Sequence, residues 1–122
     1  MILFLDDDDD LRENLADVFA TFMDEETLLL SSHRAMLDEE RALVLACRLA
    51  VLDINLGADA PSGLDAYRWL RSHDFAGPII FLTGHARAHP LVREAERMGD
   101  AIVLEKPVTV GQLHAAVQAA LQ

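Results

Sequence analysis

Five polar residues of this sequence stand just after short apolar runs, and their types could do chemistry together. Asp6 and Asp7 follow the first run, Asp53 the third, Thr83 the fourth, and Lys106 stands just beyond the fifth. If the runs are parallel strands of one sheet, their carboxyl ends share one edge, where such sheets bind ligands. That edge would then gather three carboxylates, a hydroxyl and an ammonium.

This set of groups is suited to phosphoryl transfer. Carboxylates crowded in a partly dry cleft repel each other, so they hold protons or recruit a cation. Mg²⁺ fits, because it prefers oxygen ligands and keeps several waters. One carboxylate, Asp53, could then attack phosphorus and form an acyl phosphate. Thr83 could donate a hydrogen bond to one phosphoryl oxygen, and Lys106 could pair with another.

Each feature also has a simpler interpretation when taken alone. The aspartates at 6–10 are typical of a solvated acidic run. A lone aspartate after a strand, such as Asp53, is usually a turn residue, and Thr83 followed by glycine is a turn signal. The step from Lys106 to Pro107 would by itself indicate a loop. The functional interpretation therefore depends on all of these features together, in this order.

The elements that must position these residues alternate along the chain. Unbroken apolar runs indicate strands buried on both faces, at 2–5, 27–30, 49–52, 79–82 and 101–104. Between and after them, apolar residues recur at helical spacing, and the segment 33–45 is predicted as one helix without a well-defined face. Five strands alternating with five helices predict an α/β fold, a parallel sheet with helices on both faces.

Several helix starts carry capping signals. Asp9 or Asp10 is predicted to cap the first helix and Ser32 the second. Serine and threonine followed three residues later by an acid or amide predict capping boxes, in the pairs Ser62–Asp65 and Thr109–Gln112.

Length and composition narrow the function further. The chain has 122 residues, which suits one domain, and 52% of them are hydrophobic, which suits a real core. The net charge of −11 repels nucleic acid, so direct DNA or RNA binding is not expected. Cys47 is the single cysteine, and no apolar run is long enough to span a membrane. These features predict a cytoplasmic protein.

The motifs together resemble the receiver domains of two-component response regulators, the CheY-like family. The matching stretches span nearly the whole chain and read ILFLDDDDDLRENL, LAVLDINL, GLDAYRWLR, PIIFLTGHA and LEKPV. The resemblance implies that residues 1–122 form one receiver domain. It also implies a flavodoxin-like, doubly wound five-stranded sheet with strand order 2-1-3-4-5.

The resemblance also implies a role for individual residues. Asp53 would be the phosphoacceptor, and Asp6 and Asp7 would hold Mg²⁺, Asp7 more directly. Asn55 would lend the metal its backbone carbonyl, and Thr83, Lys106 and a cis bond before Pro107 would complete the site. The donor would be a histidine kinase or histidine phosphotransfer protein, and the output a conformational change that controls a partner or output domain. A homodimer through the face of helix 91–98, strand 101–104 and helix 113–121 is a further expectation.

Three positions depart from the pattern of the family. Val103 stands where relatives often have the aromatic residue that reports the state of the site. The loop from Asp53 to Gly63 is about two residues longer than in relatives, a difference that loops tolerate well. His85 and Asn55 occupy positions that tune hydrolysis of the acyl phosphate, so we expect them to set the lifetime of phosphorylated Asp53.

Two other functions remain open from the sequence. One is a receiver-like interaction module that works without phosphorylation. The presence of valine at position 103, where relatives often have an aromatic residue, favours this alternative. The other is an aspartate-nucleophile phosphatase, a class with the motif Asp-x-Asp-x-Thr/Val after its first strand. Asp6 and Asp8 fit this motif, but Asp10 stands in the place of the threonine or valine. The leading expectation is a phosphorylation switch that can dephosphorylate itself and is not a conventional enzyme.

Overall fold

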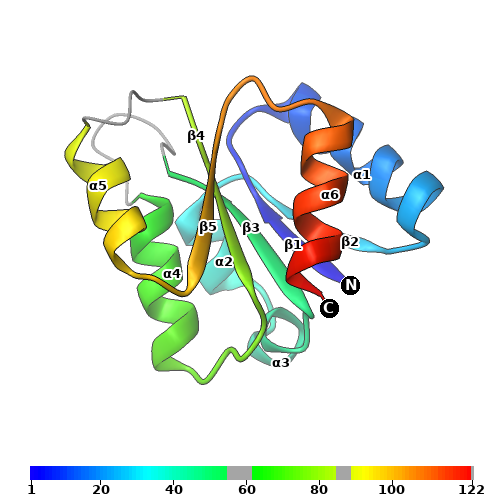
Figure 1. The fold of residues 1–122 in the computed structure, drawn as a ribbon. Coiled ribbons are helices and arrows are strands. Elements are labelled where there is room, and N and C mark those ends of the chain that lie inside the picture. The colour runs from blue at the N-terminus through cyan, green and yellow to red at the C-terminus, as the bar shows by residue number, and fades with distance from the viewer. Residues whose placement is uncertain (55–61, 85–88, 122) are drawn as a thin grey trace.

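The structure, a computed structural model, describes residues 1–54, 62–84 and 89–121 and contains a five-stranded parallel sheet. The strand order is β2-β1-β3-β4-β5, as expected from the resemblance, with every pair parallel (Figure 1). The strands are β1 (Ile2–Leu5), β2 (Thr27–Leu30), β3 (Leu49–Asp53), β4 (Ile79–Thr83) and β5 (Ala101–Glu105). The helices are α1 (Asp9–Met23), α2 (His33–Asp38), α3 (Arg41–Leu45), α4 (Gly63–Ser72), α5 (Pro90–Arg97) and α6 (Val110–Ala120).

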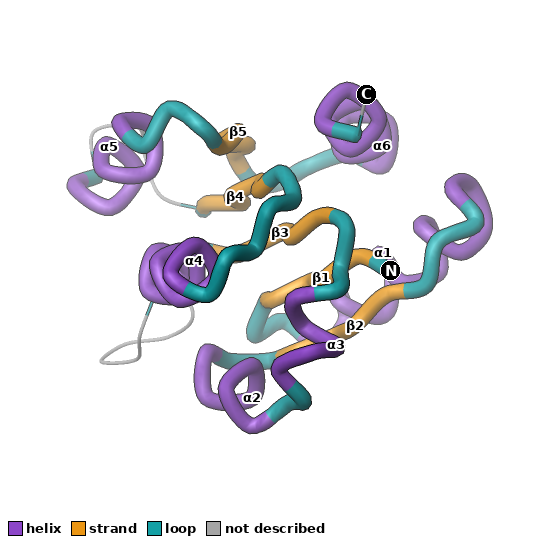
Figure 2. The backbone as a smooth tube through the Cα atoms, turned by 90° about the horizontal axis from the view of Figure 1, so that it is seen from below, coloured by secondary structure: helices purple, strands orange, loops and turns teal. Residues whose placement is uncertain are grey.

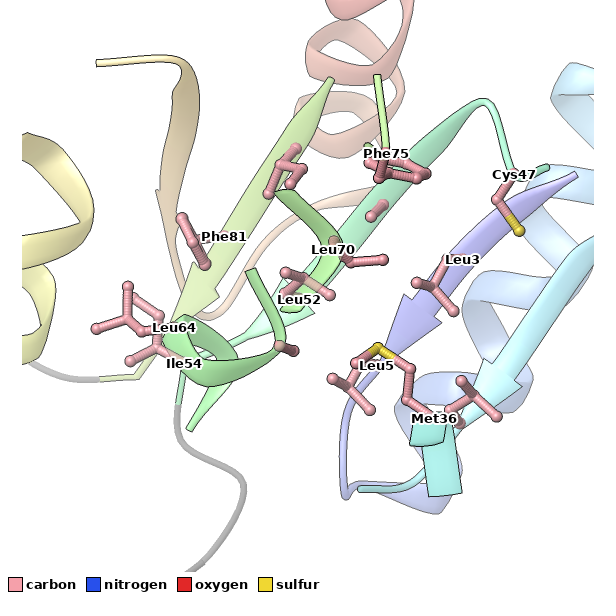
Figure 3. Close-up of a cluster of buried hydrophobic side chains, with 14 of the residues drawn as sticks. Leu3, Leu5, Met36, Cys47, Leu52, Ile54, Leu64, Leu70, Phe75 and Phe81 are labelled. Carbon is pink, nitrogen blue, oxygen red and sulfur yellow. The ribbon is translucent and has the colours of Figure 1, made fainter. Parts of the chain in front are cut away.

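The sheet is buried on both faces, because alternate side chains of each central strand enter different cores. In β1, Leu3 and Leu5 join one core, whereas Ile2 and Phe4 join the other. The first core lies beneath α2, α4 and α5, and the second beneath α1 and α6 (Figure 2). Figure 3 shows the first core, where side chains from the sheet meet those of α2 and α4. The unbroken apolar runs are explained by this double burial.

The segment 33–45 is two helices, so the prediction of one helix was wrong. The backbone is extended at Glu39 (φ −76°, ψ 158°) and Glu40 (φ −61°, ψ 121°), between α2 and α3. Acidic side chains at the carboxyl end of a helix oppose its dipole, whereas they suit the amino end of the next one. No apolar side chain stands at 38–41 to hold the turn against the sheet.

The predicted caps are correct at three helices and wrong at one. Ser32 accepts a hydrogen bond from the amide of Ala35 at 3.0 Å, and both predicted capping boxes are present. At α1 the cap is Asp8, whose Oδ1 accepts from the amide of Leu11 at 3.1 Å. In a run of identical residues, the capping position is decided by where β1 ends and the chain turns.

None of the helices in the described ranges is both long and apolar enough to cross a membrane.

Candidate functional site

Asp6 and Asp53 lie side by side at the carboxyl edge of the sheet. β1 and β3 are neighbours with Leu5 opposite Leu52, so the residue that follows each comes level with the other. The amide of Asp6 donates to the carbonyl oxygen of Leu30 at 3.1 Å, which continues the hydrogen bonding between β1 and β2. Asp6 is fully buried and Asp53 is 2% exposed. Two carboxylates are therefore held next to each other and largely away from solvent.

Asp7 completes a cluster of three carboxylates with them. One oxygen from each of Asp6, Asp7 and Asp53 lies within 4.8 Å of the others, and Asp7 is the exposed member. The turn is tight, since Oδ1 of Asp6 accepts a hydrogen bond from the amide of Asp8 at 2.9 Å. Hard oxygen donors with one side open to water are the ligands that Mg²⁺ prefers in proteins. This donor set fits the ion that the sequence predicts.

Lys106 reaches the cluster from the loop after β5. Its Nζ lies 2.9 Å from Oδ2 of Asp6 and 3.2 Å from Oδ2 of Asp53. Burial acts to lower the pKa of the Lys106 ammonium. The hydrogen bond to Asp6 and the charges of Asp53 and Asp6 outweigh that effect, so the pKa is raised above 10.5. Lys106 is therefore a firmly protonated cation between two carboxylates.

Thr83 and the chain around Lys106 are joined through the backbone. Thr83 ends β4, is fully buried, and pairs with Glu105 in the β4–β5 register. Its carbonyl oxygen accepts a hydrogen bond from the amide of Lys106 at 2.7 Å. The peptide bond from Lys106 to Pro107 is cis. The strand ends of β4 and β5 are thus fastened together beside the carboxylates.

Val103 lies within the sheet, away from the cluster. It pairs with Phe81 of β4, is partly buried, and packs against the core beneath α4 and α5. The ring of Phe81 is 5.6 Å from that of Tyr67 on α4, whose hydroxyl donates to Asp100 at 2.6 Å. The predicted modulating residues Asn55 and His85, and the longer part of the loop after Asp53, lie outside the described residues.

Two residues beside the site were not singled out in the sequence. Arg12 of α1 donates through Nη1 to the backbone carbonyl oxygen of Asp6 at 2.6 Å. Gly63, the first residue of α4, lies so close to β3 that a Cβ there would be 2.3 Å from the carbonyl oxygen of Asp53. The i, i+3 spacing of Asp9 and Arg12 in the sequence indicates an ion pair on the first turn of the helix, and this pair could have drawn attention to the arginine. The glycine resembled an ordinary loop residue in sequence.

Comparison with known proteins finds matches along nearly the whole chain. The family model of the response regulator receiver domain matches residues 2–118. The chain is 33% identical to the transcriptional regulatory protein FixJ of Azorhizobium caulinodans over 120 residues, which cover 96% of this chain and 53% of FixJ. It is 31% identical to the regulatory protein AtoC of Escherichia coli over 121 residues, which cover 99% of this chain and 25% of AtoC. The chain thus spans about half of one relative and a quarter of the other.

Solved structures show the same architecture. The receiver domain of NtrX from Brucella abortus superposes with a TM-score of 0.82 and 26% identity, covering 99% of this chain and 98% of that one. The chemotaxis protein CheY4 of Vibrio cholerae superposes with a TM-score of 0.80 over 98% of this chain and 97% of that one. At 20% identity, the second likeness supports the fold alone.

Proposed function

The chain belongs to the response regulator receiver domain family, and from that premise we propose that residues 1–122 form one receiver domain that accepts a phosphoryl group on Asp53. The acceptance is Mg²⁺-dependent, with Asp6, Asp7, Asp53 and the backbone carbonyl of Asn55 as the residues that hold the ion. The donor is a histidine kinase or a histidine phosphotransfer protein. The phosphorylated form controls a partner protein or an output domain.

One observation carries this proposal. Asp6, Asp7 and Asp53 bring carboxylate oxygens within 4.8 Å of each other, and the Lys106 ammonium lies 3.2 Å from Asp53. Such crowding costs free energy in a structural site, since like charges repel strongly where water is partly excluded. The same crowding of carboxylates is expected in a functional site that binds a cation and a phosphoryl group together.

Each residue then has a task in the transfer. A carboxylate oxygen of Asp53 attacks phosphorus and the bond from phosphorus to the imidazole nitrogen of the donor breaks. The donor ring, already protonated at its other nitrogen, takes the electron pair of that bond and leaves as neutral imidazole. Lys106 can move its ammonium from Asp53 to a phosphoryl oxygen, because the carboxylate it pairs with loses its negative charge on becoming an acyl phosphate, a mixed anhydride. Thr83 donates a hydrogen bond from its hydroxyl group to another phosphoryl oxygen. A bound Mg²⁺ ion offsets the charge on the phosphoryl oxygens.

The output face lies one strand away from the site. Val92 and Glu96 of α5, Val103 of β5, and Gln112 and Ala115 of α6 line a hollow of about 500 Å³. We place partner binding or homodimer formation on this α5–β5–α6 face. The dianionic phosphoryl group would reposition Thr83 and Lys106, and these two are hydrogen-bonded at the end of the strand pair that bears Val103.

The longer relatives suggest the kind of output. FixJ and AtoC are named as regulatory proteins and extend well beyond the region that matches this chain. By analogy, we propose that this receiver controls a regulatory output domain or a separate target protein. Asn55 and His85 are proposed to set the rate at which the acyl phosphate hydrolyses. A cytoplasmic setting suits the single free cysteine, Cys47.

Treatment with a small acyl phosphate tests the function directly. Acetyl phosphate with MgCl₂ should add one phosphoryl group to the intact chain, detected by mass spectrometry, and peptide mapping should locate it on Asp53. Chelation with EDTA or the change Asp53→Asn should abolish the adduct, whereas Asp10→Asn should not. An adduct on Asp6 would instead favour the phosphatase, and no adduct at all would favour a module that works without phosphorylation.

A further inference from the structure

Arg12 holds the turn that carries the metal-binding aspartates, although it lies outside the cluster itself. It belongs to α1, and its side chain is only 15% exposed despite its length and charge. The guanidinium folds back toward the end of β1, where Nη1 donates to the carbonyl oxygen of Asp6 at 2.6 Å. Nη2 forms an ion pair with Oδ1 of Asp9. One rigid group therefore joins Asp6, the residue that follows β1, to Asp9, the residue that begins α1.

The turn between those two points contains Asp7. The backbone of Asp6 is held at both its amide and its carbonyl group. The amide donates a hydrogen bond to Leu30, and the carbonyl oxygen accepts one from Arg12. Asp8 is held by two hydrogen bonds: its backbone amide donates to Oδ1 of Asp6, and its side chain caps α1 by accepting from the amide of Leu11. Asp7 is exposed, so its direction depends on the backbone between these fixed neighbours.

The contacts of Arg12 show which property matters. In the described residues its ion pair is with Asp9, whose side chain is 81% exposed, and its other bond is to a backbone carbonyl oxygen. The guanidinium therefore acts on the shape of the turn through two directed bonds. Lysine offers a point charge without the planar fork and cannot make both bonds in the same geometry.

We propose that Arg12 is a positioning residue for metal binding, which holds the Asp6–Asp7 peptide so that both carboxylates face Asp53. This proposal rests on the proposed function, because it requires that the cluster bind Mg²⁺. The proposal predicts that loss of Arg12 weakens Mg²⁺ binding, whereas charge alone predicts that it tightens Mg²⁺ binding. A cation near an acidic site weakens binding of another cation, so loss of charge alone would tighten Mg²⁺ binding.

The test measures Mg²⁺ affinity by titration calorimetry in the unmodified chain and in Arg12→Ala, Arg12→Lys and Arg34→Ala. Arg34 is the matched control: it forms an i, i+4 pair with Asp38, its side chain is 84% exposed, and its loss changes the net charge equally. Arg12→Ala should weaken binding about tenfold, the lower end for residues that orient metal ligands. Arg12→Lys should be equally weak, and Arg34→Ala should bind as the unmodified chain does.

Thermal unfolding without Mg²⁺ separates positioning from general damage. Arg12→Lys is expected to unfold close to the temperature of the unmodified chain while still binding Mg²⁺ about tenfold more weakly. Unchanged or tighter binding in Arg12→Ala, or full recovery in Arg12→Lys, would overturn the proposal while leaving Asp53 phosphorylation intact. Failure of the unmodified chain to bind Mg²⁺ would overturn this proposal and the proposed function together.

Discussion

The first residue of α4, Gly63, lies against the backbone of Asp53, the last residue of β3. A Cβ at Gly63 would stand 2.3 Å from the carbonyl oxygen of Asp53 and 2.9 Å from its carbonyl carbon. The amide of Gly63 also donates to the carbonyl oxygen of Ile54 at 3.1 Å. The amino end of α4 is thus packed directly on the strand end that presents Asp53, the proposed nucleophile.

Gly63→Ala should therefore both destabilise the chain and weaken phosphorylation. The new methyl group meets backbone, which cannot rotate away, so the cost should be about 1–3 kcal/mol of unfolding free energy. Urea unfolding measures the loss. Gly111→Ala in α6 is the control, because a Cβ there meets nothing within 4 Å. That change should stabilise by about 0.5–1 kcal/mol, and an equal effect at both glycines would contradict the argument.

Lys106→Met should lower stability at neutral pH by about 2 kcal/mol, because it leaves buried carboxylates without their cation. This is less than for a fully buried pair, since the Lys106 side chain is 26% exposed. The raised pKa of Lys106 fixes the pH dependence: the stabilisation is fully present below about pH 10.5 and is lost as the pH rises through the higher folded-state pKa.

Unfolding of both proteins between neutral and alkaline pH checks this prediction. The difference in unfolding free energy should stay constant up to the ordinary titration range of lysine and shrink above it. Tyr67 titrates in the same region, because burial and its hydrogen bond to Asp100 raise its pKa. It is present in both proteins, so the difference removes its contribution. A gap that widens at high pH would show that Lys106 is not stabilised as a cation.

Asp53→Asn should stabilise the chain in metal-free buffer, on the order of 1 kcal/mol, because the charged neighbours of Asp53 found among residues 1–54, 62–84 and 89–121 include two carboxylates and the ammonium of Lys106. With MgCl₂ the order should reverse. The unmodified chain gains about 2.7 kcal/mol when the metal is present at a hundred times its dissociation constant, and the variant gains little. Thermal unfolding with and without MgCl₂ measures both effects. Lower stability of the variant without metal would mean that attraction to Lys106 outweighs the repulsion.

Asp8→Ala should cost about 1 kcal/mol, the usual loss when a helix cap is removed. Asp8→Asn should keep most of that stability, because the amide oxygen can still accept from Leu11. Asp10→Ala should lose only a few tenths, from the helix dipole. Denaturant unfolding of the three variants checks this order. A larger loss at Asp10 would restore the cap position predicted from the sequence.

The strands and the strand-end residues could be predicted because burial on both faces leaves a strong mark in sequence. The runs that end at Asp6, Asp53 and Thr83 are apolar without interruption, and parallel topology brings their ends together. The break at Glu39 could not be predicted in the same way, since both halves of the segment are compatible with helix. Choosing among five adjacent aspartates for the cap required the position of the turn.

Contacts between one element of the fold and the next were the part that the sequence did not reveal. The need for glycine at 63 comes from the approach of α4 to Asp53, and nothing local marks it. The role of Arg12 depends on a side chain that turns back toward β1, whereas an arginine in an amphipathic helix normally extends into water. Both features follow from packing geometry.

The position of Lys106 gives the acidic cluster an internal counter-ion. A cation that binds there competes with a counter-ion that is already present, so binding exchanges one ionic state for another. Apparent affinity then reports the difference between those states, and it will be weaker than three unpaired carboxylates would give. The lysine thereby raises the concentration of metal at which the cluster would fill, and it balances part of the charge of the empty cluster.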